Sequence, residues 1–133
     1  MTTPSSEALP RPTEAELDIL TVLWRLGPST VRQAHEELAA IKPWQYSTTL
    51  KLMQIMAGKG LLKRDDSERS HVYRPAVGRE ETQQQLVARL IDRAFGGSVR
   101  SLLVGALDAK RASKKELSEL MQMIEERTKG RKR

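Results

Sequence analysis

The segment 47–58 carries polar side chains at a spacing that could read DNA bases. Ser47 and Thr48 offer hydroxyl groups that donate or accept hydrogen bonds, and Lys51 can donate to the acceptors of guanine. Leu50 can contact a thymine methyl, and Gln54 follows further along the same segment. The other positions form a mainly apolar face at helical spacing: Thr49, Leu52, Met53 and Met56. This alternation predicts a helix with one buried face and one face that contacts bases.

Each of these residues also has a simpler interpretation. Ser47 and Thr48 could serve only to cap the helix. Lys51 could contact a phosphate or lie free on the surface. Just ahead of the helix, Trp44 and Tyr46 each have a polar edge that could bind phosphate and a ring large enough to seal the turn. We expect Trp44 to seal the turn and leave both roles open for Tyr46.

Two short extended runs with a polar tip supply further candidate contacts. Residues 61–64 and 71–74 are predicted strands of a hairpin, joined by a polar segment. Arg69 is the best candidate for a phosphate contact, because its fork of donors matches phosphate oxygens, and His71 is a weaker one. Lys63 on the first run and Arg32 in the preceding helix complete the predicted DNA contacts.

Positive charge is concentrated in this part of the chain. The net charge is +6, and residues 42–74 hold seven basic side chains against three acidic ones. Over residues 7–37 the balance is reversed, with six acidic side chains against three basic ones. A basic surface limited to the second helix and the hairpin is what contact with phosphates requires. A solvated basic face without a partner is the alternative.

The elements that must position these residues begin with two capped helices. Thr13 and Thr30 are followed three residues later by Glu16 and Gln33, which is the capping-box pattern. The expected apolar faces are Leu17, Leu20 and Trp24 in the first helix and Val31, Ala34 and Leu38 in the second. The base-reading helix then ends at residues 58–60, Gly-Lys-Gly. Helix, turn, helix and hairpin in this order predict a winged helix-turn-helix at residues 13–78.

Three amphipathic helices are predicted between residues 79 and 127. The first ends at Gly96-Gly97, Ser98 can cap the second, and Ser113 with Glu116 can cap the third. A compact winged helix leaves little apolar surface to cover their stripes, so we predict a two-fold homodimer. A monomer with these helices folded back on the winged helix is the alternative. The predicted dimer contacts are Leu86, Leu90, Phe95, Val99, Leu102, Leu103, Leu107, Leu117, Leu120 and Ile124.

Composition excludes several other classes. The chain has no cysteine, and its two histidines, His35 and His71, lie on different predicted elements, so we expect no metal site and no cofactor. We interpret His35 as an edge-of-core residue. Paired carboxylates in an apolar setting, a glycine-rich phosphate loop and a nucleophile with a base are all missing, so we expect no enzyme. Without a membrane-length apolar run or a signal-peptide pattern, we expect a soluble cytoplasmic protein with no membrane insertion. Residues 1–12 are expected to form a disordered arm, and residues 128–133 a basic, frayed tail.

In its order of motifs the chain resembles the BlaI/MecI/CopY family of bacterial transcriptional repressors, from about residue 13 to residue 126. The motifs that carry the resemblance lie at residues 13–17, 23–24, 27–28, 30–32, 46–49, 59–62, 71–75, 95–98 and 102–103. The resemblance implies a homodimer with amino-terminal winged helices and a carboxy-terminal dimerisation region. It also implies repression through a dyad DNA operator with TACA and TGTA half-sites, and release when a membrane sensor metalloprotease triggers cleavage of the dimerisation region.

Two departures from the family pattern concern the inducing signal. The copper-responsive branch has a cysteine-rich tail, which this chain lacks. The β-lactam branch is cut at an Asn-Phe bond, and Gly105-Ala106 stands at that place here.

The sequence thus predicts a mainly α protein with a small β-hairpin wing, which acts as a repressor without catalytic activity. A winged-helix protein-interaction module and a repressor that senses a small molecule directly are the alternatives. The charge distribution favours DNA over the first alternative, and no polar constellation supports the second.

Overall fold

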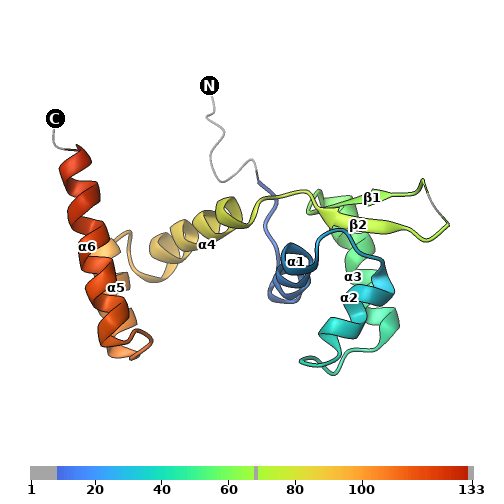
Figure 1. The fold of residues 1–133 in the computed structure, drawn as a ribbon, viewed down its shortest axis with the longest axis horizontal. Coiled ribbons are helices and arrows are strands. Elements are labelled where there is room, and N and C mark those ends of the chain that lie inside the picture. Colours follow the sequence, from blue (N-terminus) through green and yellow to red (C-terminus); the bar gives the residue numbers. More distant parts are fainter. Residues whose placement is uncertain (1–8, 68, 132–133) are drawn as a thin grey trace. The chain divides into compact units, whose positions relative to one another are not determined.

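The computed structural model describes residues 9–67 and 69–131. These residues form six helices and a two-stranded antiparallel hairpin (Figure 1), as predicted. In chain order the elements are α1 (Glu14–Leu26), α2 (Val31–Leu38), α3 (Tyr46–Lys59), β1 (Leu62–Asp65), β2 (Val72–Pro75), α4 (Arg79–Ala94), α5 (Val99–Asp108) and α6 (Lys114–Arg131). Within the described residues, no helix has the length and apolar character needed to cross a membrane.

Both predicted capping boxes begin their helices. At α1 the Thr13 hydroxyl accepts from the Glu16 amide at 3.2 Å, and the Glu16 carboxylate accepts from the Thr13 amide at 2.9 Å. At α2 the same two bonds join Thr30 and Gln33, at 3.1 and 2.9 Å. Each box satisfies two amides that would otherwise lack a partner at a helix start. The sequence therefore fixes where these two helices begin.

The core of the amino-terminal part lies among α1, α2, α3 and the hairpin. Val31, Ala34 and Leu38 are buried as predicted. On α1 the buried set is Ile19, Leu20, Val22 and Leu23, whereas Leu17 and Trp24 are only half-buried. The predicted face is therefore confirmed at Leu20 and, with Trp24 packed against the core, in part at Trp24, but it omits Ile19, Val22 and Leu23. The pattern of α1 offers apolar residues on more than one side. A buried aliphatic side chain of this size contributes about 1.5–3 kcal/mol.

Helix α3 begins earlier than predicted. Its amino-terminal cap is Gln45, without a side-chain cap bond, so Ser47 and Thr48 lie inside the helix and do not cap it. The helix ends as predicted, at Gly60, whose φ of 88° is a left-handed conformation that glycine adopts without strain. Thr49, Met53 and Met56 face the core, and Leu52 is half-buried.

The hairpin is fixed to the start of α2 by a short bridge. Each strand begins one residue later than predicted, and the register pairs Leu62 with Pro75 and Asp65 with Val72. Tyr73 of β2 also exchanges two backbone hydrogen bonds with Ser29, at 2.8 and 2.9 Å. Because Ser29 directly precedes the cap of α2, these bonds hold the wing beside the first turn of that helix.

The chain divides into two compact units within α4. One ends at Leu86 and the other begins at Val87, whereas we expected a boundary at residue 78. The first turns of α4 belong with the winged helix because Thr82 and Gln85 are buried there. Gln85 Nε2 donates to the carbonyl of Leu9 at 3.0 Å. Part of the predicted amino-terminal arm is therefore anchored, and its residues 1–8 lie outside the described residues.

The second unit contains the end of α4, α5 and α6. Gly96 and Gly97 break the helices with positive φ angles, and the Ser98 hydroxyl caps α5, as predicted. Ser113 accepts from the Glu116 amide at 3.1 Å at the start of α6. Helix α6 runs on to Arg131, although we expected a frayed tail over residues 128–133. Residues 132 and 133 of that predicted tail lie outside the described residues. The tail continues the helix because its residues include no proline and only one glycine.

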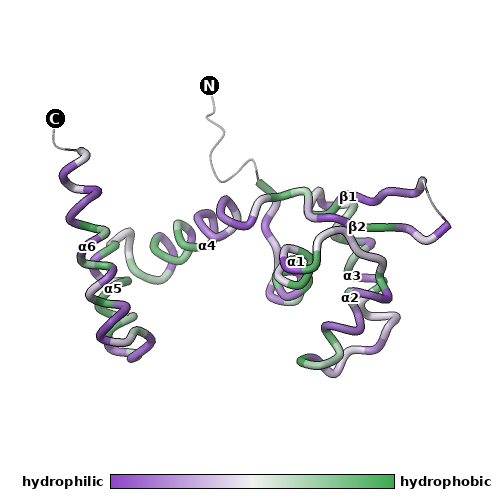
Figure 2. Tube along the Cα trace, in the orientation of Figure 1, coloured by the Kyte–Doolittle hydropathy of each residue, from purple (hydrophilic) through white to green (hydrophobic). Residues whose placement is uncertain are grey.

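No side chain between residues 87 and 130 is fully buried. At Gly105 an added Cβ would lie 3.3 Å from a ring carbon of Phe95, so the ring packs closely against this part of α5. Hydrophobic residues nevertheless recur along α5 and α6 (Figure 2). This unit therefore has apolar faces but no core of its own.

Candidate nucleic-acid interface

A groove lies between the start of α2, the exposed face of α3 and the wing. It brings together six of the ten predicted DNA contacts: Arg32, Tyr46, Leu50, Gln54, Arg69 and His71. The remaining lining residues were not among the predicted contacts: Thr30, Val31, Arg64, Ser70 and Tyr73. Among the described residues, the lining contains three arginines and no acidic residue. The groove is thus a concave, positively charged surface formed by three separate elements.

Ser47, Thr48 and Lys51 lie outside this groove, on the exposed surface of α3. They lie in the first two turns of the helix, and none of them is tied to a cap. Leu50 is half-buried and packs against the core, so its side chain is shared between the core and the groove. The structure therefore keeps the polar predicted base readers exposed and separates them from the groove residues.

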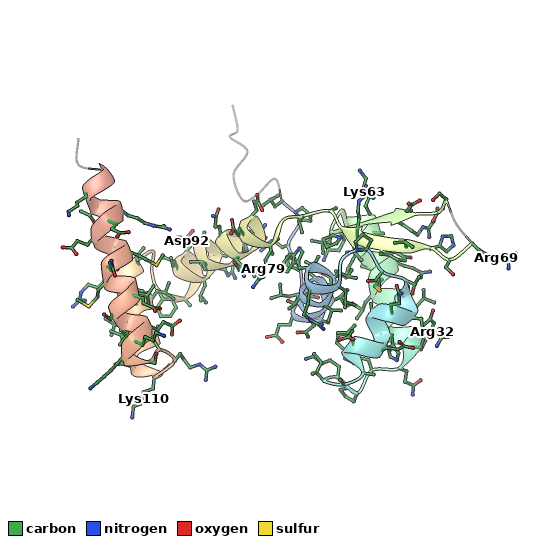
Figure 3. The ribbon with its side chains drawn as sticks, viewed as in Figure 1. Arg32, Lys63, Arg69, Arg79, Asp92 and Lys110 are labelled. Carbon is green, nitrogen blue, oxygen red and sulfur yellow. The ribbon has the colours of Figure 1, made fainter. Side chains whose placement is uncertain are left out.

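Lys63 lies on the other side of the wing. In the hairpin register Lys63 pairs with Arg74, and Arg64 pairs with Tyr73. Tyr73 is buried against the helices, so Arg64 shares the inner side of the hairpin while Lys63 and Arg74 point outward. Figure 3 shows Lys63 pointing away from the helices of this unit, and Arg69 at the tip of the wing. Arg64, which the sequence analysis missed, is the basic side chain of β1 that reaches the groove.

Arg64 is held by two neighbours. Its Nε donates to Asp66 Oδ1 at 2.8 Å, and the same oxygen is 2.5 Å from His71 Nδ1. The hydrogen bond to Tyr73 and the negative charge of Asp66 raise the pKa of Arg64 above its ordinary value. These contacts fix the guanidinium at the groove wall before any ligand arrives.

The basic residues of this region divide into paired and unpaired groups. Lys42 is 3.0 Å from Asp18, and Lys59 is 2.7 Å from the buried carboxylate of Glu16. These two lysines therefore stabilise the fold. Among the described residues between 30 and 74, the lysines and arginines that form no ion pair are Arg32, Lys51, Lys63, Arg69 and Arg74. The unpaired charges lie on α2, α3 and the wing, where a polyanion could reach them.

Four side chains join α2 to α3 beside the groove, and we call them the α2–α3 ladder: Arg32, Tyr46, His35 and Thr49. The Arg32 guanidinium carbon lies 5.1 Å above the Tyr46 ring centre. The rings of His35 and Tyr46 meet edge to face, with centres 5.7 Å apart and planes at 84°. His35 Nδ1 is 2.8 Å from Thr49 Oγ1. Tyr46 is thus a groove residue with a fixed ring.

Trp44 has a different place. It is half-buried against the core, with the Lys42 ammonium 5.8 Å from its ring centre. This position seals the turn before α3, as expected. Trp24 also packs against the core and donates from Nε1 to the carbonyl of Val77 at 3.1 Å.

Comparison with known proteins places this geometry in context. The profile of the penicillinase repressor family matches residues 12–126. The penicillinase repressor of Bacillus licheniformis is 25% identical over 118 residues, which are 89% of this chain and 92% of that protein. The transcriptional regulator BlaI of Mycobacterium tuberculosis is 34% identical over 93 residues, covering 68% of this chain and 67% of that protein.

A solved structure resembles the amino-terminal part. The DNA-binding domain of the repressor BlaI superposes with a TM-score of 0.50 at 23% identity, covering 55% of this chain and 89% of that domain. At this identity the likeness concerns the fold, which is a winged helix in both.

Proposed function

The chain belongs to the penicillinase repressor family, and from this premise we propose that it represses transcription by binding a dyad operator in DNA as a homodimer. Members of this family are DNA-binding regulators and not enzymes. The observation that carries the proposal is the groove, because Arg32, Arg64 and Arg69 line it and none of its other described lining residues is acidic. A concave basic surface beside an exposed helix suits the backbone and the base edges of one duplex.

The two surfaces have separate tasks in this proposal. The first turns of α3 enter the major groove, where Ser47, Thr48 and Lys51 meet base edges. The groove beside them receives the phosphates, which Arg64 and Arg69 contact from the wing. Phosphate contacts set the orientation on the duplex, and the α3 contacts determine which sequence is preferred.

Dimer formation is supported by the exposure of the second unit. Val99 is 56% exposed, Leu103 is 48% exposed and Ile124 is 56% exposed in a single chain. Apolar faces of this extent without a core require a partner. A second copy of the same helices is the partner of matching length and pattern. Leu86, which we also expect in this interface, is half-buried and lines a hollow with Leu17 and Trp24 of the first unit.

The DNA-binding proposal is tested with the full chain and a library of random duplexes. Selection should enrich a sequence with two symmetric half-sites, and affinity should fall steeply with salt, by about 0.9 log units per log unit for each phosphate contacted. Arg69→Ala should reduce this slope by roughly one unit on every sequence. A shallow salt dependence without enrichment would favour the protein-interaction module.

Base reading is tested separately. Replacing Lys51 with Ala should cost about 1–3 kcal/mol on the selected operator and relax the preference at one position. Unchanged discrimination by this variant would show that α3 lies in the duplex in another orientation.

Release from the operator is proposed to follow proteolysis of the second unit, linked to a membrane sensor protease. The two connections that flank α5 support this, because Gly96-Gly97 and residues 109–113 lie between helices and their backbone is more accessible than that of a paired helix. Cutting between the dimer-forming helices would remove the affinity gained from binding two half-sites together. Because this chain has Gly105-Ala106 in place of an Asn-Phe bond, we expect the cut elsewhere within residues 96–112. Immunoblots of induced cells should reveal a shortened repressor, whereas a full-length repressor that leaves its promoter would favour direct sensing of a small molecule.

A further inference from the structure

The α2–α3 ladder contains two residues that reach the groove and two that do not. Arg32 and Tyr46 line the groove, while His35 and Thr49 lie behind them. Thr49 is fully buried, and His35 is half-buried. His35 therefore stands between a rigid core residue and an exposed aromatic ring.

His35 contacts Thr49 on one side and Tyr46 on the other. Its Nδ1 bonds to the hydroxyl of Thr49, whose helix buries Thr49, Met53 and Met56 in the core. Its ring meets the ring of Tyr46, the first residue of α3, which is 38% exposed. The ring of Tyr46 in turn supports the guanidinium of Arg32, which has no ion-pair partner among the described residues. The order of dependence runs from Thr49 through His35 and Tyr46 to Arg32.

The geometry points to His35 as a positioning residue that acts through Tyr46 to hold Arg32 ready for a DNA phosphate. This inference rests on the DNA binding proposed above, and it assigns Arg32 to the duplex backbone. Arginine loses much rotamer freedom when it is ordered. A guanidinium already stacked on a fixed ring loses less of that freedom on binding, so the complex is tighter.

The expected effect follows from that ordering cost. Ordering one such side chain on binding corresponds to an affinity loss of about 2- to 12-fold. His35→Ala in the full chain should therefore weaken binding to a duplex of random sequence by this factor. Arg32→Ala should weaken it at least as much and reduce the salt slope by roughly one unit.

The decisive measurement is a double-mutant cycle on the same random duplex. If His35 acts through Arg32, then His35→Ala should change the affinity by less than about 2-fold in a chain that already carries Arg32→Ala. Additive losses, with wild-type binding intact, would overturn the inference and leave the proposed function standing. A wild-type chain that does not bind duplex DNA at all would overturn the proposed function itself.

Two further variants separate positioning from folding. His35→Asn can keep a hydrogen bond to Thr49 and should recover part of the lost affinity, and His35→Phe keeps a ring beside Tyr46 if the alanine variant is poorly folded. Glu36→Ala is the matched control, since this exposed neighbour on α2 takes no part in the ladder. Thermal unfolding of each variant reports the fold. A loss of DNA affinity that only parallels a loss of thermal stability would also overturn the inference.

Discussion

At the residue scale, Lys63 and Arg64 show that the face of the hairpin on which a basic side chain lies decides whether it reaches the groove. They are neighbours on β1, but only Arg64 shares the inner side of the hairpin and lines the groove. We predict that Arg64→Ala weakens DNA binding by about 1–3 kcal/mol, as expected for a charge-assisted hydrogen bond, whereas Lys63→Ala has a much smaller effect. Fluorescence anisotropy with one duplex at two salt concentrations would measure both, and equal losses would contradict the assignment of faces.

Glu16 should make the stability of the first unit depend on pH. Burial raises the pKa of its carboxyl, but the hydrogen bonds from Lys59 and the Thr13 amide outweigh burial and lower the pKa below the ordinary 4.5. The unfolded chain then binds the proton more tightly, so the contribution is complete above pH 4.5 and is lost as the pH falls through the folded pKa.

The matching variant is Glu16→Gln. We predict that it lowers the free energy of unfolding by about 1–3 kcal/mol at pH 7, and that the difference from the wild type shrinks in acid, where the wild-type carboxyl is protonated. Denaturant unfolding at pH 7 and pH 3 would measure this. Glu14→Gln, an exposed change in the same turn, is the control, and a pH-independent difference for Glu16→Gln would contradict the prediction.

The wing also shows what sequence reasoning could and could not resolve at this scale. The spacing in α3 identified the exposed Ser47, Thr48 and Lys51 because a long helix repeats its faces several times. A four-residue strand repeats its faces only twice, and a shift of one residue exchanges them. Two adjacent basic residues in such a strand give no signal for which one points inward, so the sequence does not show that Arg64 lines the groove and Lys63 does not.

At the scale of elements, a helix start could be predicted where a side chain caps it and could not be predicted where tertiary packing sets it. Thr13, Thr30, Ser98 and Ser113 carry their own caps, and each helix begins where the sequence predicts. Helix α3 has no side-chain cap, so its first residue is set by packing of the preceding turn, which sequence patterns do not encode. The bridge between Ser29 and Tyr73 was also missed, because a single backbone pair leaves no pattern of side chains.

The turn between α5 and α6 contains a testable strain. Lys110 has a φ of 55°, the only positive value at a non-glycine position among the described residues. Because a left-handed conformation costs a residue with a Cβ about 1 kcal/mol, we predict that Lys110→Gly stabilises the second unit by about 0.5–1 kcal/mol. Hydrogen exchange of α5 and α6 amides would measure the change. Lys115→Gly within α6 should have the opposite sign, and protection that falls in both variants would contradict the prediction.

At the scale of the whole molecule, the two units should differ in whether they fold alone. The first unit has a buried core and includes the start of α4, so we predict that a chain ending at Leu86 is a folded monomer. A chain ending at Gly78 should also be monomeric but less stable, since it lacks the buried Thr82 and Gln85. Light scattering would measure the oligomeric state of both shortened chains, with the full chain as the reference for the proposed dimer. Thermal unfolding would measure their stability. If the chain ending at Leu86 forms a dimer, the interface lies in the first unit, and its assignment to the second unit is wrong.

No side chain between residues 87 and 130 is buried in a single chain. We therefore expect the degradation rate of this protein to depend on its concentration. In the proposed dimer, pairing covers the apolar faces of α5 and α6. A newly made chain that has not yet met a second copy would leave these helices open to cellular proteases, and pairing would protect them. At low synthesis rates most chains would be degraded before they dimerise. At higher rates dimers would form faster and the protein would accumulate. The intracellular half-life should therefore lengthen with expression level, which would give repression a threshold in gene dosage.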